Sequence, residues 1–129
     1  MRSIFIIIIC VAALANYSFA QQYDCDYKVE VITNGTEFAK EELFWRMKAT
    51  KLWGKSTNIT GLTEITDSNG RIIKKYKPWA NESISKQKTS NEYSHNLKES
   101  YKYKITGEIK VECNDENKDN NVDVKTIKK

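Results

Sequence analysis

A short polar stretch near the C-terminal end of the chain comes closest to the spacing of a metal site. Four oxygen-bearing side chains alternate there with other residues: Asp115, Asn117, Asp119 and Asn121. Alternate oxygen ligands can converge on one hard cation such as calcium. A calcium loop also needs a sharp-turn glycine and a bidentate carboxylate, and Asn120 and Thr126 stand at those positions. A solvated turn between two strands is the simpler interpretation, and calcium is kept as the alternative.

Three aromatic residues are candidates for binding a carbohydrate: Trp53, Tyr76 and Trp79. Each falls at the end of a predicted segment or beside a loop, where a ring face could stack on a sugar ring. The alternative is that these rings fill the core of a small domain, which is what we expect of Trp45. For Trp53 and Trp79 the sequence leaves both interpretations open.

Signals for catalysis are few. His95 is the only histidine, it lies in a polar segment, and no nucleophile motif accompanies it. One histidine and two cysteines that we expect to be oxidised cannot complete a tetrahedral zinc site. We therefore predict a protein that is not an enzyme and that needs no cofactor.

The first twenty residues have the features of a secretory signal peptide. Arg2 provides a short positive region, Ile4 to Leu14 form an uncharged apolar run, and Ser18-Phe19-Ala20 ends in small residues. The apolar run is shorter than the roughly 20 residues that a membrane span needs. We predict cleavage after Ala20, leaving residues 21–129 as one secreted, extracellular domain with no membrane span.

Secretion also bears on the cysteines and asparagines. Cys10 lies in the signal peptide, so Cys25 and Cys113 remain as an even pair in an oxidising compartment, where we expect them to form a disulfide. Three Asn-x-Ser/Thr sequons predict glycosylation in turns or loops: Asn34, Asn58 and Asn81. The formal net charge of +4 comes from interspersed charges of both signs, which does not favour nucleic acid as a partner.

The periodicity of apolar residues predicts mostly β-structure. Alternating segments at 26–32, 62–66, 71–77 and 101–113, with a last run at 122–127, are typical of strands that bury one face. Asn69-Gly70 between two of these segments predicts a hairpin turn, and Pro78 is expected to end the second of them. Gly107 suggests a bulge or a close approach of the backbone. Residues 79–96 are polar and are interpreted as loop or irregular edge structure.

The segment from Thr36 to Gly54 fits two interpretations. Its composition and end signals favour a helix, whereas the alternation of Leu43, Trp45 and Met47 with polar residues favours a strand. We place a short helix near residues 37–48, followed by a strand, slightly ahead of either pure form. Several short strands joined by turns and pinned by one disulfide then predict a single antiparallel, immunoglobulin-like β-sandwich.

The segment NLKESYKYKITGEI resembles the L-x-x-x-x-x-Y approach to strand F in fibronectin type III-like and related adhesion-type sandwiches. Leu97 and Tyr103 hold the two motif positions, and the turn NDENKDNN looks like the junction of strands F and G. The resemblance covers roughly residues 97–127. The proline-rich entry is missing, and Cys113 lies too far past Tyr103 for the immunoglobulin cysteine pattern. The resemblance implies an extracellular binding or adhesion module rather than an enzyme.

These observations lead to a functional hypothesis with two alternatives. We expect a small extracellular binding protein that meets a protein partner. The first alternative is a secreted carbohydrate-binding module that uses Trp53, Tyr76 and Trp79, so that its partner is a glycan. The second is a small secreted effector or hydrolase.

Overall fold

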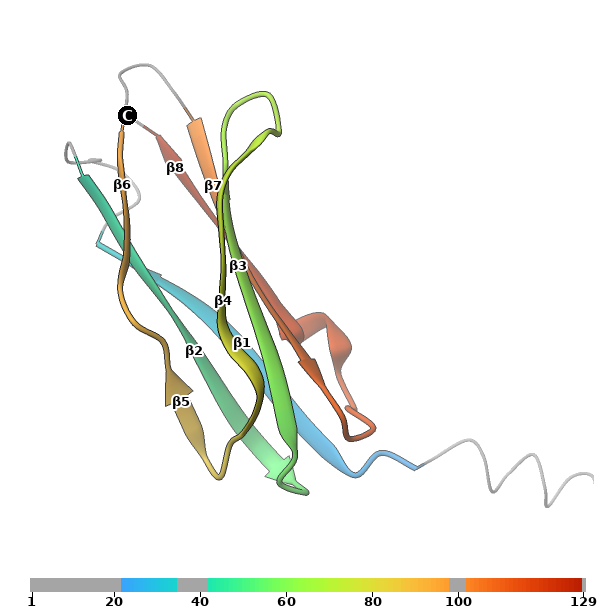
Figure 1. The fold of residues 1–129 in the computed structure, drawn as a ribbon. Helices are drawn as coiled ribbons and strands as arrows, with labels where there is room; N and C mark the ends of the chain where they lie inside the picture. Colours follow the sequence, from blue (N-terminus) through green and yellow to red (C-terminus); the bar gives the residue numbers. More distant parts are fainter. Residues whose placement is uncertain (1–21, 35–41, 98–101, 129) are drawn as a thin grey trace, which may run out of the picture.

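The computed structural model describes residues 22–34, 42–97 and 102–128. These residues form two sheets packed face to face, as Figure 1 shows. The first sheet contains β1 (Cys25–Thr33), β2 (Glu42–Gly54), β5 (Gln87–Thr89) and β6 (Tyr93–Asn96). The second has the strand order β4-β3-β7-β8, formed by β4 (Ile72–Ser83), β3 (Asn58–Thr66), β7 (Lys102–Val111) and β8 (Val122–Lys128). A 3-10 turn, η1 (Lys118–Asn121), precedes β8. The predicted immunoglobulin-like β-sandwich is confirmed.

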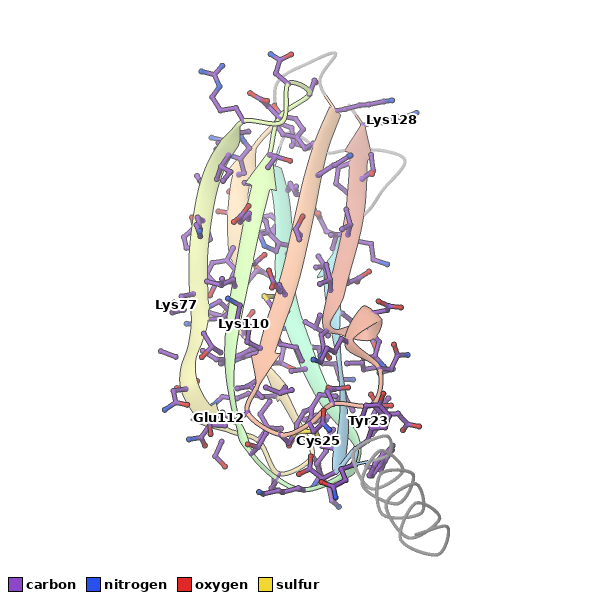
Figure 2. The ribbon with its side chains drawn as sticks, turned by 90° about the vertical axis from the view of Figure 1, so that its right-hand side faces the viewer. Tyr23, Cys25, Lys77, Lys110, Glu112 and Lys128 are labelled. Atoms are coloured by element: carbon purple, nitrogen blue, oxygen red, sulfur yellow. A yellow bond between two sulfur atoms is a disulfide. The ribbon has the colours of Figure 1, made fainter. Side chains whose placement is uncertain are left out.

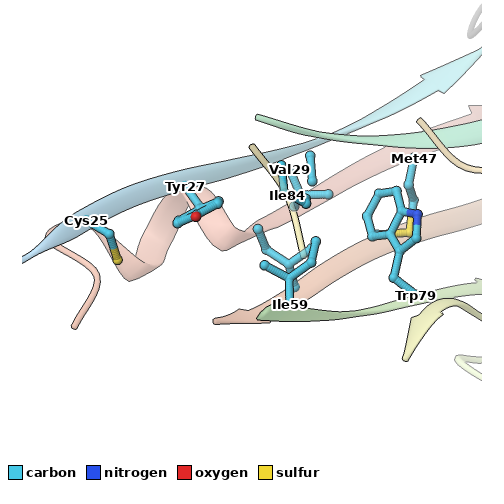
Figure 3. Packing of buried hydrophobic residues seen from close by; sticks show 9 residues of the cluster. Cys25, Tyr27, Val29, Met47, Ile59, Trp79 and Ile84 are labelled. Carbon is cyan, nitrogen blue, oxygen red and sulfur yellow. The ribbon is translucent and has the colours of Figure 1, made fainter. Parts of the chain in front are cut away.

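The neighbouring strands of both sheets run antiparallel, and this arrangement follows from the alternation in the sequence. Inward-facing residues of β1, β2, β3 and β7 are buried, while the residues between them face solvent or are half-buried. The core has two clusters. The first core cluster is shown in Figure 3 and consists of Cys25, Tyr27, Val29, Met47, Ala49, Ile59, Trp79, Ile84 and Ile109. The second core cluster consists of Val31, Leu43, Trp45, Ile65, Leu97, Tyr103, Ile105 and Ile127.

The predicted helix near residues 37–48 is wrong for its larger part, since Glu42 to Lys48 belong to β2. Leu43, Trp45 and Met47 are all buried on one face, which is the period of a strand and not of a helix. Pairing with β1 on one side and with β5 and β6 on the other overrides the helical composition. Residues 37–41 lie outside the described residues.

The expected end of a strand at Pro78 is also wrong, because β4 continues to Ser83. In the second sheet β4 is an edge strand that pairs only with β3. The backbone nitrogen of Pro78, which carries no hydrogen, can therefore face the open edge, and no hydrogen bond between strands is lost. The segment 79–96 is accordingly less irregular than expected, and it contains the end of β4 together with β5 and β6.

Gly107 marks a close approach and not a bulge. The register of β7 with β3 and β8 is continuous through this residue. A Cβ at Gly107 would lie 2.8 Å from Cγ2 of Val31 in the opposite sheet. The missing side chain therefore lets β1 and β7 pack closely at this point.

Leu97 and Tyr103, the two motif positions of the resemblance, are both buried in the second core cluster. Tyr103 lies near the start of β7, a central strand of the second sheet.

The predicted disulfide is confirmed. Cys25, at the start of β1, is bonded to Cys113, shortly after the end of β7, with a Cα–Cα distance of 6.1 Å. It therefore connects the two sheets covalently at one end of the sandwich. Among the described residues there is no helix that is long and apolar enough to cross a membrane.

Candidate functional site

The end of the sandwich that carries the disulfide gathers most of the residues that the sequence singled out. We call this region the disulfide end, and it comprises residues 22–26, 52–55 and 113–121. Backbone hydrogen bonds hold its three segments together. Asp24 N–H donates to the carbonyl of Asn114 at 3.1 Å, Lys55 N–H donates to that of Asp24 at 2.8 Å, and Glu116 N–H donates to that of Cys25 at 2.9 Å. Figure 2 labels Tyr23 and Cys25 at this end.

Asp115 is the most deeply buried acidic residue in the described part of the chain, with 1% of its surface exposed. Its Oδ2 accepts hydrogen bonds from the backbone N–H of Tyr27 at 3.1 Å and from Nδ2 of Asn121 at 3.1 Å. Its Oδ1 accepts from the backbone N–H of Asn117 at 2.9 Å. All three donors are neutral, so the carboxylate is hydrogen-bonded but has no counter-charge from them.

Asp26 lies next to this carboxylate and adds to the negative charge. Burial raises the pKa of Asp26, and the nearby carboxylates of Asp115 and Glu116 raise it further, while a hydrogen bond from Asn120 opposes them. That bond runs from Nδ2 of Asn120 to Oδ1 of Asp26 at 3.2 Å. Asp26, Asp115 and Glu116 thus lie near one another at the disulfide end, which also contains Lys55 and Lys118.

The four residues of the predicted calcium loop do not act as one set of converging ligands. Asp115 and Asn121 point inward and bond each other. Asn117 caps the 3-10 turn by accepting from the backbone N–H of Asp119, whose side chain is exposed. The alternate spacing in the sequence would bring the four side chains to one side of an extended loop. The 3-10 turn instead directs successive side chains away from one another.

The three aromatic residues proposed for sugar binding are also separated. Trp53 lies at the end of β2 and is 43% exposed, whereas Trp79 in β4 is 2% exposed within the first core cluster. Tyr76 is half-buried and stacks on Tyr93 with ring centroids 4.3 Å apart. Trp79 therefore offers no free ring face, and a platform of all three rings is not formed.

Trp53 is the one member of that trio at the disulfide end. Its indole Nε1–H donates to Oε2 of Glu116 at 2.9 Å, which holds the ring in place. Tyr23 is 53% exposed and Leu52 is 47% exposed at the same end. Exposed aromatic and aliphatic side chains therefore lie at the same end as these carboxylates. The sequence pointed to Trp53 by its position at a segment end, but it gave no signal for Tyr23 or Leu52.

The predicted glycosylation sites differ in their surroundings. Asn34 is exposed, but its Oδ1 accepts from the N–H of Phe44 at 3.1 Å and its Nδ2 donates to the carbonyl of Glu42 at 3.3 Å. Asn58 is half-buried in β3, and Asn81 is exposed in β4 with a φ of 51°. Attachment of glycans to these residues stays a prediction.

The histidine and cysteine residues do not form a metal or catalytic centre in the described part of the chain. His95 lies half-buried in β6, with its ring centroid 5.6 Å from that of Tyr103. Asp24, Cys25 and Cys113 are the residues whose ligand-type atoms come within 4.8 Å of one another. The two sulfur atoms are joined in the disulfide and are not available as thiolates.

Comparison with solved structures places the fold. The chain is similar to the crystal structure of the CARDB domain of the PF1109 protein from Pyrococcus furiosus in complex with di-metal ions. The TM-score is 0.59 at 14% identity, covering 84% of this chain and 96% of that one. A solution NMR structure of the CARDB domain of PF1109 gives a TM-score of 0.60 at 14% identity, covering 83% and 96%.

This likeness shows the fold alone, which is an immunoglobulin-like β-sandwich. The resemblance to fibronectin type III-like domains is thus confirmed at the level of architecture and not as a specific family. No protein-family profile matches the chain, and no match was found among curated proteins.

Proposed function

We propose that the chain is a secreted, non-catalytic binding module that meets an extracellular protein through the disulfide end. The observation that carries this proposal is Trp53, which is 43% exposed although tryptophan is costly to leave in water. Its hydrogen bond to Glu116 fixes the ring before any partner arrives. A rigid, exposed aromatic ring loses little conformational entropy on binding, and tryptophan is enriched among residues that dominate interface energies.

The surroundings of Trp53 indicate the character of the partner. Tyr23 and Leu52 are further exposed apolar residues at this end, and Asp26 and Glu116 lie beside Trp53. A complementary partner would present an apolar pocket with basic groups at its rim. The fold supports this role because adhesion-type sandwiches present binding surfaces at their ends and edges.

Secretion is part of the proposal and rests on the predicted signal peptide. The Cys25–Cys113 disulfide supports an oxidising compartment. Expression of the full chain in secreting cells, followed by N-terminal sequencing of the protein in the medium, should give a start at Gln21. Retention of residues 1–20 on the secreted protein would contradict the proposed cleavage.

The binding role is tested with matched surface variants. Labelled protein is added to intact cells and to an array of extracellular proteins, and bound protein is quantified. Trp53→Ser should weaken binding roughly 30-fold, as expected for a central interface residue worth about 2 kcal/mol. Ile73→Ser replaces another exposed apolar residue, 37% exposed in β4, and should leave binding unchanged. Equal effects of the two substitutions would contradict a role for the disulfide end.

A carbohydrate partner is the second candidate, favoured by the same exposed ring. Trp53 alone could stack on a sugar, although Trp79 cannot join it. A glycan array separates the two candidates. Glycan binding that is lost in Trp53→Ser would replace the protein partner with a sugar.

A further inference from the structure

The two sheets differ in how the charges on their outer faces are paired. On the first sheet, Nζ of Lys28 lies 2.8 Å from Oε1 of Glu30. Nη2 of Arg46 likewise lies 2.8 Å from Oε2 of Glu92. Lys48 stands directly opposite Glu30 in the register of β1 and β2. Charges of the two signs therefore balance one another on this face.

The outer face of the second sheet is rich in lysine instead. Residues that alternate with its buried positions point outward, and these lysines are among them: Lys75, Lys77, Lys102, Lys104, Lys110 and Lys128. We call this surface the lysine face, and Figure 2 labels Lys77, Lys110 and Lys128 on three of its strands. Fewer glutamates lie there: Glu64, Glu108, and Glu112 just past the end of β7. Lys75 is paired with Glu64 at 3.6 Å.

The lysines of β7 are the informative ones, because β7 is a central strand between β3 and β8. Lysine on an edge strand discourages the association of one sheet with another, which accounts for Lys77 on β4 and Lys128 on β8. A central strand needs no such protection. Edge protection therefore does not account for Lys102, Lys104 and Lys110, which are all exposed.

The strands beside β7 do not neutralise these lysines. Lys104 stands opposite Thr66 on β3 and Thr126 on β8. Lys102 stands opposite Lys128, so two positive charges face each other, which is unfavourable. Among the described residues, no lysine of β7 forms an ion pair. An anionic ligand on this face would offset the repulsion.

We propose that the lysine face binds a linear sulfated polysaccharide that lies along β7. Strand geometry places Lys102 and Lys104 about 7 Å apart along the chain, and Lys110 about 20 Å further on. A polymer with sulfate groups on successive sugar units can contact such a row at several points. Lys77 on β4 and Lys128 on β8 widen the positive surface on either side of the row.

The aromatic residues of the second sheet favour a polysaccharide over a nucleic acid. They are Tyr76, Trp79 and Tyr103, and all three pack in the core clusters. The described strands of the lysine face therefore offer no ring for a base to stack on, whereas single-stranded nucleic acids are held largely by stacking. Anionic lipids are concentrated in the cytoplasmic leaflet of membranes, which a secreted protein does not meet. The choice of a polysaccharide thus rests on the proposed secretion.

Isothermal titration of the secreted protein with dextran sulfate tests the proposal, and uncharged dextran is the comparison. We expect binding of dextran sulfate at about 0.05 M NaCl that is lost by about 0.5 M, because salt screens contacts between exposed charges. Uncharged dextran should not bind. Lys102→Gln, Lys104→Gln and Lys110→Gln combined should weaken the affinity roughly tenfold. The urea midpoint of this variant should be no lower than that of the wild type, since the repulsion of Lys128 is relieved.

The matched control removes three cations from the outer face of the first sheet, with Lys28→Gln, Arg46→Gln and Lys48→Gln combined. The net charge falls by the same amount as in the β7 variant. Because these cations lie on the opposite face of the sandwich, the affinity for dextran sulfate should change less than about threefold.

The proposal is overturned if dextran sulfate gives no binding heat at low salt, or if the two triple variants weaken binding equally. Tighter binding of phosphatidylserine vesicles or of a single-stranded oligonucleotide than of dextran sulfate would also overturn it. Trp53→Ser should keep its affinity for dextran sulfate, because Trp53 lies at the end of β2 in the other sheet. A failure at the lysine face is therefore distinguishable from a failure of the role proposed for the disulfide end.

Discussion

Asp123 Oδ2 accepts a hydrogen bond from the backbone N–H of Val31 at 2.8 Å, and this contact joins the edge strand β8 of one sheet to the edge strand β1 of the other. Asp115 accepts from the N–H of Tyr27, four residues earlier on the same edge. Because the N–H groups of an edge strand can recruit another strand, the two carboxylates protect β1 from edge-to-edge association.

We predict that Asp123→Ala destabilises the protein and exposes this edge. The N–H of Val31 would lose its partner at a partly buried position, which costs about 1–3 kcal/mol of unfolding free energy. Urea denaturation measures the loss, and analytical ultracentrifugation should detect more self-association than in the wild type. Thr126→Ala, at an exposed position of β8, serves as the control and should change neither quantity. A variant as stable and as monomeric as the control would contradict the edge-capping role.

A second prediction concerns Gly61 in β3. A Cβ at this position would lie 2.5 Å from Cε3 of Trp79, so Gly61→Ala forces the buried indole to shift. Overpacking of this kind costs about 1–3 kcal/mol. We expect a lower urea midpoint and an altered near-ultraviolet circular dichroism signal from Trp79. Lys77→Ala, at an exposed position of the neighbouring strand, should leave both unchanged. Unaltered spectra in Gly61→Ala would mean that the core has more room than the structure shows.

The raised pKa of Asp26 predicts a pH-dependent effect of its removal. Between the ordinary value of 3.8 and the higher folded value, the folded protein binds more protons than the unfolded chain. The contribution of Asp26 to stability therefore falls as pH rises through this window. Asp26→Asn should be more stable than the wild type at neutral pH, and the difference should disappear below pH 3.8. Denaturation curves across this range measure it. A variant less stable than the wild type at neutral pH would contradict the idea that the ionised carboxylate of Asp26 destabilises the folded protein.

The disulfide is expected to supply a large share of the stability. It closes a loop with a sequence separation of 88 residues, and the chain-entropy model assigns such a link about 4 to 5 kcal/mol. Cys25→Ala combined with Cys113→Ala should lower the free energy of unfolding by about that amount. Denaturant titration measures it, and the reduced wild-type protein provides the comparison. A loss below about 1 kcal/mol would show that the sheets hold together without the link.

The fold was predictable to a large extent because most strands bury one face and expose the other. The alternation between Tyr103 and Val111 predicts β7 directly, and the even pair of cysteines predicts the disulfide. The segment containing β2 was ambiguous since its residues also favour helices, and only its pairing with strands distant in sequence decides between the two.

The candidate site was less predictable because its parts are distant in sequence. Asp26 and Asn120 are 94 residues apart and come together only when β1 lies beside η1. Similarly, nothing in the sequence distinguishes Trp53 from Trp79. The register that places Trp79 opposite Gly61 buries one ring, and the end of β2 leaves the other in solvent.

The position of the disulfide also determines how the domain would carry mechanical load. A pulling force applied between a point before Cys25 and the end of β8 would pass through the sulfur atoms to Cys113. The segment from β1 to β7 lies within the covalent loop, so it would bear no tension along its chain and could not be drawn out. Only the segment after Cys113, which contains η1 and β8, could lengthen under load, and this limits the extension of the domain.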